Sequence, residues 1–381
     1  MADNNENKVL NVPHLRFPEF SGEWEMASLQ DIAAINPKSD QLQNTFIYID
    51  LEAVEKGELR KIQEIMREEA PSRAQRVINN NDILFQCVRP YQKNNYIHKI
   101  LNTSNQQWVA STGYAQIRTT ESPNYIYHLL NTDGFNRKVM VRCTGSSYPA
   151  INSEDLATIR FYYTPDKKEQ FKISRLLDLI DERIATQNKI IEDLKLLKSA
   201  IRKKVFVSLK EEHTESCEIN QLLTYEQPTA YIVTNDEYST DTTLIPVLTA
   251  NKGFVLGYTD EDFSIYQKGE CIIFDDFTMD AKYVSFPFKV KSSAIKILTA
   301  KPNVNLRFMF EYLSYLELKS EEHKRHYISE IASLVVELPS KEMQNKIASL
   351  MTSLDNKLAL EENTKVKYED EKQYQLSQMF I

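Results

Sequence analysis

Glycine and cysteine are scarce in this sequence of 381 residues, which has eight glycines and four cysteines. No glycine-rich loop follows a strand-like run, which argues against the phosphate-binding loops of nucleotide-dependent enzymes. The cysteines lie far apart, without a Cys-x-x-Cys pair or a histidine at metal-ligand spacing. We therefore predict buried free thiols in a reducing compartment, with neither disulfides nor a zinc site.

Long apolar segments are also missing. The N-terminus has no apolar signal core, and no uninterrupted apolar run reaches membrane length. These absences predict a cytoplasmic protein.

The formal net charge is −8, with a basic segment at 165–204 and a strongly acidic one at 205–338. Nucleic-acid binders usually carry a basic stripe, so we expect the chain alone to bind DNA weakly.

The sequence contains an internal repeat. One gap-free offset places Pro165 on Pro339, Gln170 on Gln344 and Phe206 on Phe380. Apolar residues three to four apart in both copies predict two long amphipathic helices. Such helices need an apolar partner, either each other or the neighbouring domain. The residues predicted to pack between the helices are Ile173, Leu176, Leu177, Ile180, Ile184, Leu194, Leu197, Ile201, Ile347, Leu350, Met351, Leu354 and Leu358.

Short β-branched and aromatic runs separated by turns precede each helix, which predicts an α+β fold. The first unit is predicted to be mixed α/β, and the second to be β-rich with hairpins. The predicted order is a leader at 1–20, a domain at 21–164, a helix at 165–207, a domain at 208–338 and a helix at 339–381.

Polar side chains on the turns between these runs are candidates for DNA contact, because such groups can face phosphates and base edges. Solvated loops have a similar composition. A Gly-Ser-Ser turn before the first helix exposes backbone N–H groups, and a basic cluster interrupts the acidic second unit. The candidates in the first unit are Arg73, Arg76, Gln86, Arg89, Lys93, Thr112, Arg142, Gly145, Ser146, Ser147 and Tyr148. Those in the second are Lys252, Thr278, Lys282, Lys291, His323, Lys324, Arg325, His326 and Tyr327.

Few residues suggest catalysis. Asp276 with Glu317 and Lys319 could imitate a nuclease triad, although the latter two fit a solvated charge pair better. His323 and His326 could bind a metal, but no cysteine or carboxylate supports them. We predict a protein that is not an enzyme and binds no metal.

Several segments together resemble one known family. They are LRFPEFSGEW at 15–24, GSSYPAI at 145–151, the helix start from Thr164, and the runs at 245–259 and 272–278. This combination is similar to the specificity subunit of type I restriction-modification systems. The resemblance implies two target recognition domains, related by a pseudo-two-fold repeat, and two conserved helices that form an antiparallel coiled coil. Each domain would read one half of a bipartite DNA target, and the helices would set the spacing.

The same resemblance implies partners. Two methyltransferase subunits, and through them restriction subunits, would assemble on this non-catalytic chain. The partners would use S-adenosylmethionine, ATP and Mg, and this subunit would bind no cofactor. The second unit departs from the pattern, since its opening lacks a tryptophan equivalent to Trp24 and the last helix becomes polar beyond Glu361. A two-domain coiled-coil scaffold without a DNA role is the alternative.

Overall fold

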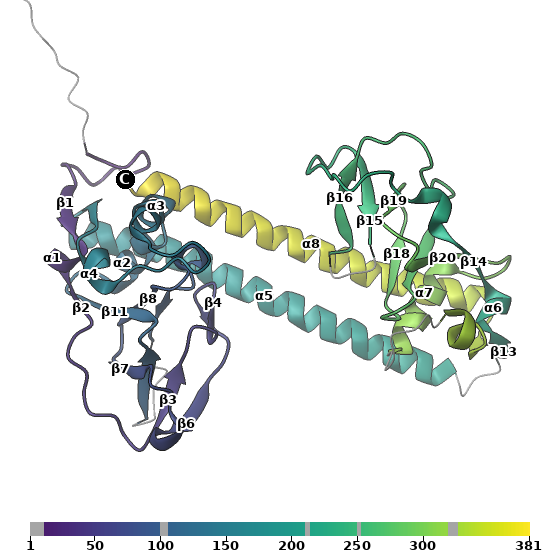
Figure 1. Cartoon of the computed structure of the whole chain (residues 1–381), viewed down its shortest axis with the longest axis horizontal. Helices are drawn as coiled ribbons and strands as arrows, with labels where there is room; N and C mark the ends of the chain where they lie inside the picture. Colours follow the sequence, from purple (N-terminus) through teal and green to yellow (C-terminus); the bar gives the residue numbers. More distant parts are fainter. Residues whose placement is uncertain (1–10, 100–105, 210–213, 250–252, 319–326) are drawn as a thin grey trace, which may run out of the picture. The chain divides into compact units, whose positions relative to one another are not determined.

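The computed structural model describes residues 11–99, 106–209, 214–249, 253–318 and 327–381 (Figure 1). The chain forms two compact units. Unit 1 consists of Met1–Asn188 and Thr364–Ile381, and unit 2 of Lys189–Asn363. The boundaries between the units therefore fall inside two long helices, α5 (Lys167–Leu209) and α8 (Lys341–Met379). These helices begin and end within two residues of the bounds predicted from the repeat.

Unit 1 contains two four-stranded sheets, in the orders β6-β3-β10-β7 and β2-β11-β8-β9, and the small pairs β1-β12 and β4-β5. Its strands are β1 (Glu25–Ser28), β2 (Ala33–Ile35), β3 (Thr45–Ile49), β4 (Val54–Glu55), β5 (Glu58–Leu59), β6 (Gln63–Met66), β7 (Ala74–Ile78), β8 (Ile83–Gln86), β9 (Tyr96–Ile97), β10 (Gln107–Ser111), β11 (Tyr114–Thr119) and β12 (Arg160–Tyr163). Its shorter helices are α1 (Leu29–Ile32), α2 (Pro123–Leu130), α3 (Asp133–Arg142) and α4 (Ser153–Ala157).

Strand β8 joins two apolar cores of unit 1 because successive side chains of a strand point to opposite faces. Ile83 and Phe85 enter the core that also contains residues of α2 and of both long helices. Leu84, between them, enters a second core with residues of β3, β7 and β10. The sheet β2-β11-β8-β9 is therefore covered on both faces.

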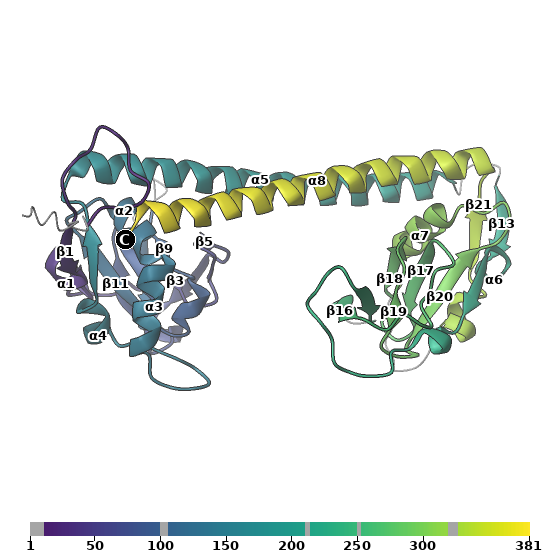
Figure 2. The same cartoon turned by 90° about the horizontal axis from the view of Figure 1, so that it is seen from above.

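Unit 2 has a four-stranded sheet, β14-β20-β17-β18, a three-stranded sheet, β16-β15-β19, and the pair β13-β21. Its strands are β13 (Glu215–Glu218), β14 (Leu223–Glu226), β15 (Ile245–Leu248), β16 (Val255–Thr259), β17 (Cys271–Asp275), β18 (Ala281–Val284), β19 (Lys289–Val290), β20 (Ile295–Ala300) and β21 (Val335–Leu338). Its shorter helices are α6 (Ile219–Leu222), α7 (Leu306–Tyr315) and the π-helix η4 (Tyr327–Ile331). Helix α7 covers the four-stranded sheet on the side of the long helices (Figure 2).

The internal repeat extends from the helices into the domains. The succession β1-α1-β2 in unit 1 corresponds to β13-α6-β14 in unit 2, and each short helix starts with a capping box, Ser28 with Asp31 and Glu218 with Gln221. The central pair β11-β8 corresponds to β20-β17. The structure thus confirms an α+β fold built twice.

The long helices run antiparallel within each unit. In unit 1, Asp181 of α5 lies 2.5 Å from Lys372 of α8, and Arg183 lies over the Tyr368 ring, 5.9 Å from its centroid. In unit 2, Lys195 of α5 lies 3.1 Å from Glu362 of α8, and Lys198 pairs with Asp355. The residue numbers rise along one helix as they fall along the other, which fixes the direction.

Buried glutamines fix the start of each long helix to its domain. The side chain of Gln170 donates to the carbonyl of Thr164 (2.8 Å) and accepts from the backbone N–H of Ser122 (3.0 Å), the N-cap of α2. Gln344 donates to the carbonyl of Pro339 (2.9 Å) and accepts from the N–H of Asn305 (2.8 Å), the N-cap of α7. The same pair of glutamine hydrogen bonds therefore joins each long helix to its domain in both halves of the repeat.

Of the thirteen predicted packing residues, five are buried, six are partly exposed and two are exposed. Ile173 and Leu177 are buried in the main core of unit 1, and Ile347 in that of unit 2, so the helix ends pack on domains as well as on each other. Leu197 and Leu350 are 50% and 43% exposed, so their prediction as interface residues was wrong. Both residues follow the apolar spacing, but spacing alone does not show which side of the helix a neighbour covers.

A charged cluster joins α7 to the long helices in unit 2. The buried carboxylate of Glu311 lies 2.8 Å from Arg202 of α5 and 2.7 Å from Arg307 of α7. Asp355 of α8 pairs with Lys198 of α5 and with Arg307. Three helices are thus connected through side chains of opposite charge.

The cysteines are free thiols, as predicted; Cys87, Cys217 and Cys271 are buried and Cys143 is half-buried. Burial raises the pKa of the Cys87 thiol to about 12, which keeps it protonated and unreactive. Among the helices that the structure describes, none has the length and apolar character needed to span a membrane.

Candidate nucleic-acid interface

Four turns of unit 1 meet at one surface, and backbone hydrogen bonds hold them together. The N–H of Thr112, in the β10–β11 turn, donates to the carbonyl of Arg73 before β7 (2.9 Å). The N–H of Arg89, beyond β8, donates to the carbonyl of Pro149 in the 144–150 loop (2.8 Å). The N–H of Cys87, after β8, donates to the carbonyl of Gly113 in the β10–β11 turn (3.0 Å), which joins the two pairs of segments. The arginine surface, as we call it, consists of Arg73, Arg76, Arg89, Thr112 and the loop 144–150.

The loop 144–150 is closed at its base and exposed at its tip. Thr144 and Ala150 exchange two backbone hydrogen bonds of 2.9 Å. Gly145 has φ +89°, and a Cβ there would lie 3.0 Å from the carbonyl oxygen of Tyr148, so this turn requires glycine. Ser146, Ser147 and Tyr148 are exposed. Their hydroxyl groups and backbone are therefore open to a ligand.

Three arginines of this surface have no acidic partner among the described residues. The guanidinium of Arg89 stacks over the Tyr148 ring, 4.3 Å from its centroid. Arg76 is half-buried, its Nε has no hydrogen-bond partner, and desolvation lowers its pKa. Arg73 is exposed. A desolvated guanidinium without a counter-ion is costly, so a bound anion or base edge would stabilise it.

Other candidates in unit 1 have internal partners. Lys93 lies 2.6 Å from Asp133 and donates to the carbonyl of Asn131. Arg142 donates to the carbonyl of Asp155 and the hydroxyl of Thr158, both at 2.7 Å. These two cations hold neighbouring segments of unit 1 together.

The prediction that Gln86 contacts DNA was wrong. Gln86 is 3% exposed on β8, a strand with all four residues buried. Its side chain donates to Gln92 (3.0 Å) and accepts from the N–H of Asn94 (3.1 Å). The amide is satisfied inside the protein, which is what burial of a polar group requires.

In unit 2, too, the DNA-contact candidates among the described residues interact with other residues of the chain. Thr278 donates to Asp275 (2.6 Å), and Lys282 lies 2.7 Å from Asp280. Lys291 is 4.0 Å from Asp236. Five further candidates lie outside the described residues: Lys252, His323, Lys324, Arg325 and His326.

The prediction for Tyr327 was also wrong, because its ring belongs to the core. Tyr327 is 2% exposed, 5.5 Å from the Phe274 ring and 5.7 Å from the Tyr225 ring. Its N–H donates to Asp276, which is itself buried and 3.4 Å from Lys296. Asp276 therefore stabilises the start of η4 and is inaccessible to a substrate.

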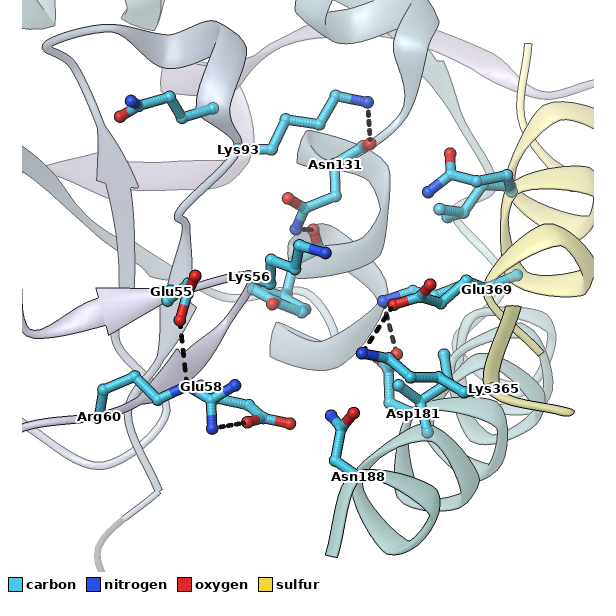
Figure 3. A pocket seen from close by; sticks show the side chains of 16 residues that line it. Glu55, Lys56, Glu58, Arg60, Lys93, Asn131, Asp181, Asn188, Lys365 and Glu369 are labelled. Carbon is cyan, nitrogen blue, oxygen red and sulfur yellow. Dashed lines mark hydrogen bonds and ion pairs between the residues drawn. The ribbon is translucent and has the colours of Figure 1, made fainter. Parts of the chain in front are cut away.

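A polar pocket of about 390 Å³ lies in unit 1 between the β4–β5 turn, α2 and the parts of α5 and α8 that belong to this unit (Figure 3). Five cations and four carboxylates line it, and four of the cations lie in ion pairs. Arg60 lies 2.8 Å from Glu58, and Lys372 lies 2.5 Å from Asp181. Lys365 lies 3.7 Å from Glu369, and Lys93 pairs with Asp133 outside the lining. Gly57 at the turn (φ +83°) has no room for a Cβ, which would be 2.4 Å from the Tyr127 hydroxyl. Most of the charges in the pocket therefore bind other residues of unit 1, which argues against a dedicated anion site. Nowhere in the described ranges do three potential metal ligands gather.

Sequence reasoning missed one exposed aromatic residue near the arginine surface. Tyr91 is 51% exposed in the 3-10 helix η2 (Pro90–Gln92), two residues after Arg89. An exposed aromatic ring beside a free guanidinium could stack on a base. The signal available in the sequence was the pair of cations, Arg89 and Lys93, that flanks it.

Comparison with known proteins gives a consistent result. The family model described as type I restriction modification DNA specificity domain matches residues 21–196 and 211–369. The specificity subunit of the Escherichia coli type I restriction enzyme EcoR124I/EcoR124II is 39% identical over 142 residues, which are 36% of this chain and 35% of that subunit. The match thus spans about a third of this curated relative.

Two solved structures share the fold. The S subunit of a type I restriction-modification system from M. genitalium has a TM-score of 0.63 and 14% identity, covering 97% of this chain and 99% of that one. A chain from a study of complex assembly and conformational transition in a type I R-M system has a TM-score of 0.57 and 18% identity, covering 93% and 96%. At these identities the likeness concerns the fold alone.

Proposed function

Because this chain belongs to the type I restriction modification DNA specificity family, we propose that it is the non-catalytic subunit that reads DNA sequence for a type I restriction-modification complex. The double construction of the fold supports a bipartite target, with one half read by each unit. The alternative of a scaffold without a DNA role is not favoured by this family membership.

One observation supports DNA recognition by unit 1 above the others: three guanidinium groups on the arginine surface lack acidic partners. Arginine donates two hydrogen bonds to guanine O6 and N7, the commonest specific contact in the major groove. Serine hydroxyls and backbone N–H groups, such as those of the 144–150 loop, bind phosphates and fix the register. The surface thus offers both kinds of contact.

The partners proposed are two methyltransferase subunits and, through them, restriction subunits. Family membership supports these partners. The exposed apolar side chains of the long helices do not by themselves mark a docking surface, because single exposed apolar residues are common on protein surfaces. These side chains include Leu196 (69% exposed), Leu360 (58%) and Val366 (51%). S-adenosylmethionine, ATP and Mg would be bound by those partners, in the cytoplasm.

The proposal is tested by sequencing the DNA sites methylated by the reconstituted complex. We expect Arg73→Ala, Arg76→Ala or Arg89→Ala to relax the preference at positions within one half-site. Each lost bidentate contact costs about 1–3 kcal/mol of discrimination. Arg142→Ala is the matched control, because its guanidinium already binds Asp155 and Thr158. Unchanged preference in all three variants, or equal relaxation of both half-sites, would contradict the assignment.

A further inference from the structure

The short helix η2 rests on a buried glutamine at the end of β8. Gln86 is 3% exposed, and the pairing of β9 with β8 covers Ile83 and Leu84 but ends before it. The side chain of Asn95 takes the place of the strand, because its Oδ1 accepts from the N–H of Gln86 (2.8 Å). The Nδ2 of Asn95 donates to Asn131 at the end of α2 (3.0 Å). The segment after β8 is therefore attached to unit 1 through buried side chains.

The side chain of Gln86 also fixes the backbone of η2. Its Nε2 donates to Oε1 of Gln92, the last residue of η2 (3.0 Å), and its Oε1 accepts from the N–H of Asn94 (3.1 Å). These two bonds bracket Lys93, whose backbone is left-handed (φ +52°). Arg89, before η2, has the same conformation (φ +54°). Residues other than glycine keep it only where the surrounding structure holds them there, so the bonds of Gln86 stabilise a turn that would otherwise relax.

Helix η2 presents two side chains of the candidate DNA surface. Arg89 lies at its start, with the guanidinium 4.3 Å from the centroid of the Tyr148 ring. Tyr91 lies in its middle and is 51% exposed. Because η2 has three residues, a change of backbone conformation at either end turns both side chains together. Where these groups point therefore depends on hydrogen bonds made below the surface.

Unit 2 has a residue with a similar role at the corresponding position. Gln86, the last residue of β8, pairs with Tyr114, the first residue of β11. In the same way Asp275, the last residue of β17, pairs with Ile295, the first residue of β20. The carboxylate of Asp275 accepts from the hydroxyl and the N–H of Thr278 in the turn that follows (2.6 and 3.3 Å). In both units the last side chain of the central strand thus fixes the next turn, by different chemistry.

We propose that Gln86 is a positioning residue that sets the base preference of the unit 1 half-site without touching DNA. It does so by holding η2 in the conformation in which Arg89 and Tyr91 reach the bases. Its side chain is buried and both ends of its amide are bonded to the segment that it holds. The DNA target rests on the proposed function; the hydrogen bonds of Gln86 do not.

The test sequences the DNA sites methylated by the reconstituted complex with Gln86→Met or Gln86→Glu. Methionine is similar to glutamine in length and volume but donates no hydrogen bond and accepts only weakly. We expect Gln86→Met to lower base discrimination roughly tenfold within one half-site and to leave the other half-site unchanged. A glutamate can still accept from the N–H of Asn94 and, once the Gln92 amide turns over, from that side chain. Gln86→Glu should therefore retain most of the preference.

A positioning role also predicts that the effect of Gln86 passes through η2. Adding Gln86→Met to the double variant Arg89→Ala, Tyr91→Ala should reduce discrimination by a further factor of about two at most, because the groups that Gln86 holds are gone. Leu84→Met is the matched control, since Leu84 is buried on the same face of β8 and the change conserves volume. It should leave both half-sites unchanged. Tryptophan fluorescence in urea shows whether unit 1 of each variant is folded under the conditions of the assay.

Three results would overturn the inference while leaving the proposed function intact, if Arg89→Ala relaxes one half-site. They are wild-type preference in Gln86→Met, equal relaxation of both half-sites, and full additivity with the double variant. If unit 1 of Gln86→Met does not fold, Gln92→Leu removes one of the two bonds at an exposed position, and it should lower discrimination about threefold in the same half-site. Wild-type preference in that variant would equally overturn the inference. A wild-type complex without a bipartite preference would overturn the proposed function itself.

Discussion

Replacing Phe380, near the C-terminus, with alanine should destabilise unit 1. Phe380 is 7% exposed in the main core of unit 1, with ring centroids 6.1 Å from Trp24 and 5.3 Å from Tyr125. Truncation of a buried phenylalanine removes its transfer free energy and leaves a cavity. We expect a loss of about 3–5 kcal/mol in the free energy of unfolding of unit 1.

Tryptophan fluorescence during urea unfolding measures this effect, because both tryptophans, Trp24 and Trp108, lie in unit 1. With a urea dependence of about 2–3 kcal/mol per molar, the midpoint should fall by roughly 1–2 M. Phe206→Ala is the matched variant. Phe206 occupies the same repeat position, but it is buried in unit 2, 4.8 Å from the Tyr312 ring.

Phe206→Ala should therefore leave the tryptophan transition in place while lowering the stability of unit 2. Ile381→Ala, which changes a 44% exposed neighbour, controls for the proximity of the C-terminus. An unchanged midpoint in Phe380→Ala would refute the packing argument. An equal shift in both phenylalanine variants would refute the assignment of each helix end to its own core.

Three further predictions concern buried polar groups. Burial lowers the pKa of His98 to about 4, so between pH 6.5 and 4 the unfolded chain binds a proton at this histidine and the folded chain does not. The free energy of unfolding should therefore fall by about 2 kcal/mol as the pH drops from 6.5 towards 4. Urea titrations of His98→Phe should show a weaker dependence on pH. Glu311→Gln should lower the free energy of unfolding of unit 2 by about 3 kcal/mol, because Arg202 and Arg307 lose a buried charged partner. Circular dichroism measures this unfolding. The control Lys346→Ala breaks an exposed pair and should change the stability little. Gln170→Leu and Gln344→Leu should each lower the free energy of unfolding by about 1–3 kcal/mol. Amide hydrogen exchange should become faster at Ser122 in the first variant and at Asn305 in the second, because these N–H groups lose their acceptors. Unchanged exchange at both amides would contradict the role of the glutamines.

The long helices could be predicted from the sequence because two local signals agreed. Apolar spacing indicated helices, and the repeat of Pro165 as Pro339 placed their starts within two residues of the structure. The repeat inside the domains was not predictable in this way. Ser28 and Glu218 both begin capping boxes, but different residues make the same hydrogen bonds, so the sequence similarity is lost while the geometry stays.

The candidate site shows a different limit. Composition identified arginines and lysines on turns, yet it did not show which of them were free. Lys93 is paired with Asp133, forty positions away, whereas Arg89, at the other end of the same helix η2, stacks on Tyr148. Tyr327 follows a basic run and is nevertheless a core residue. Whether a polar or charged group has a partner depends on tertiary contacts between distant segments, and a single sequence does not contain that information.

The positions at which the two units divide also have a genetic consequence. Unit 2 is one uninterrupted stretch, Lys189–Asn363, whereas unit 1 is assembled from the two ends of the chain. DNA encoding unit 2 can therefore be exchanged as one cassette, joined in the middle of α5 and of α8. Those junctions fall in helical backbone, away from the buried glutamines and phenylalanines that attach each helix end to its domain. A gene of this design can replace the whole of unit 2 in a single exchange without altering the residues that hold unit 1 together.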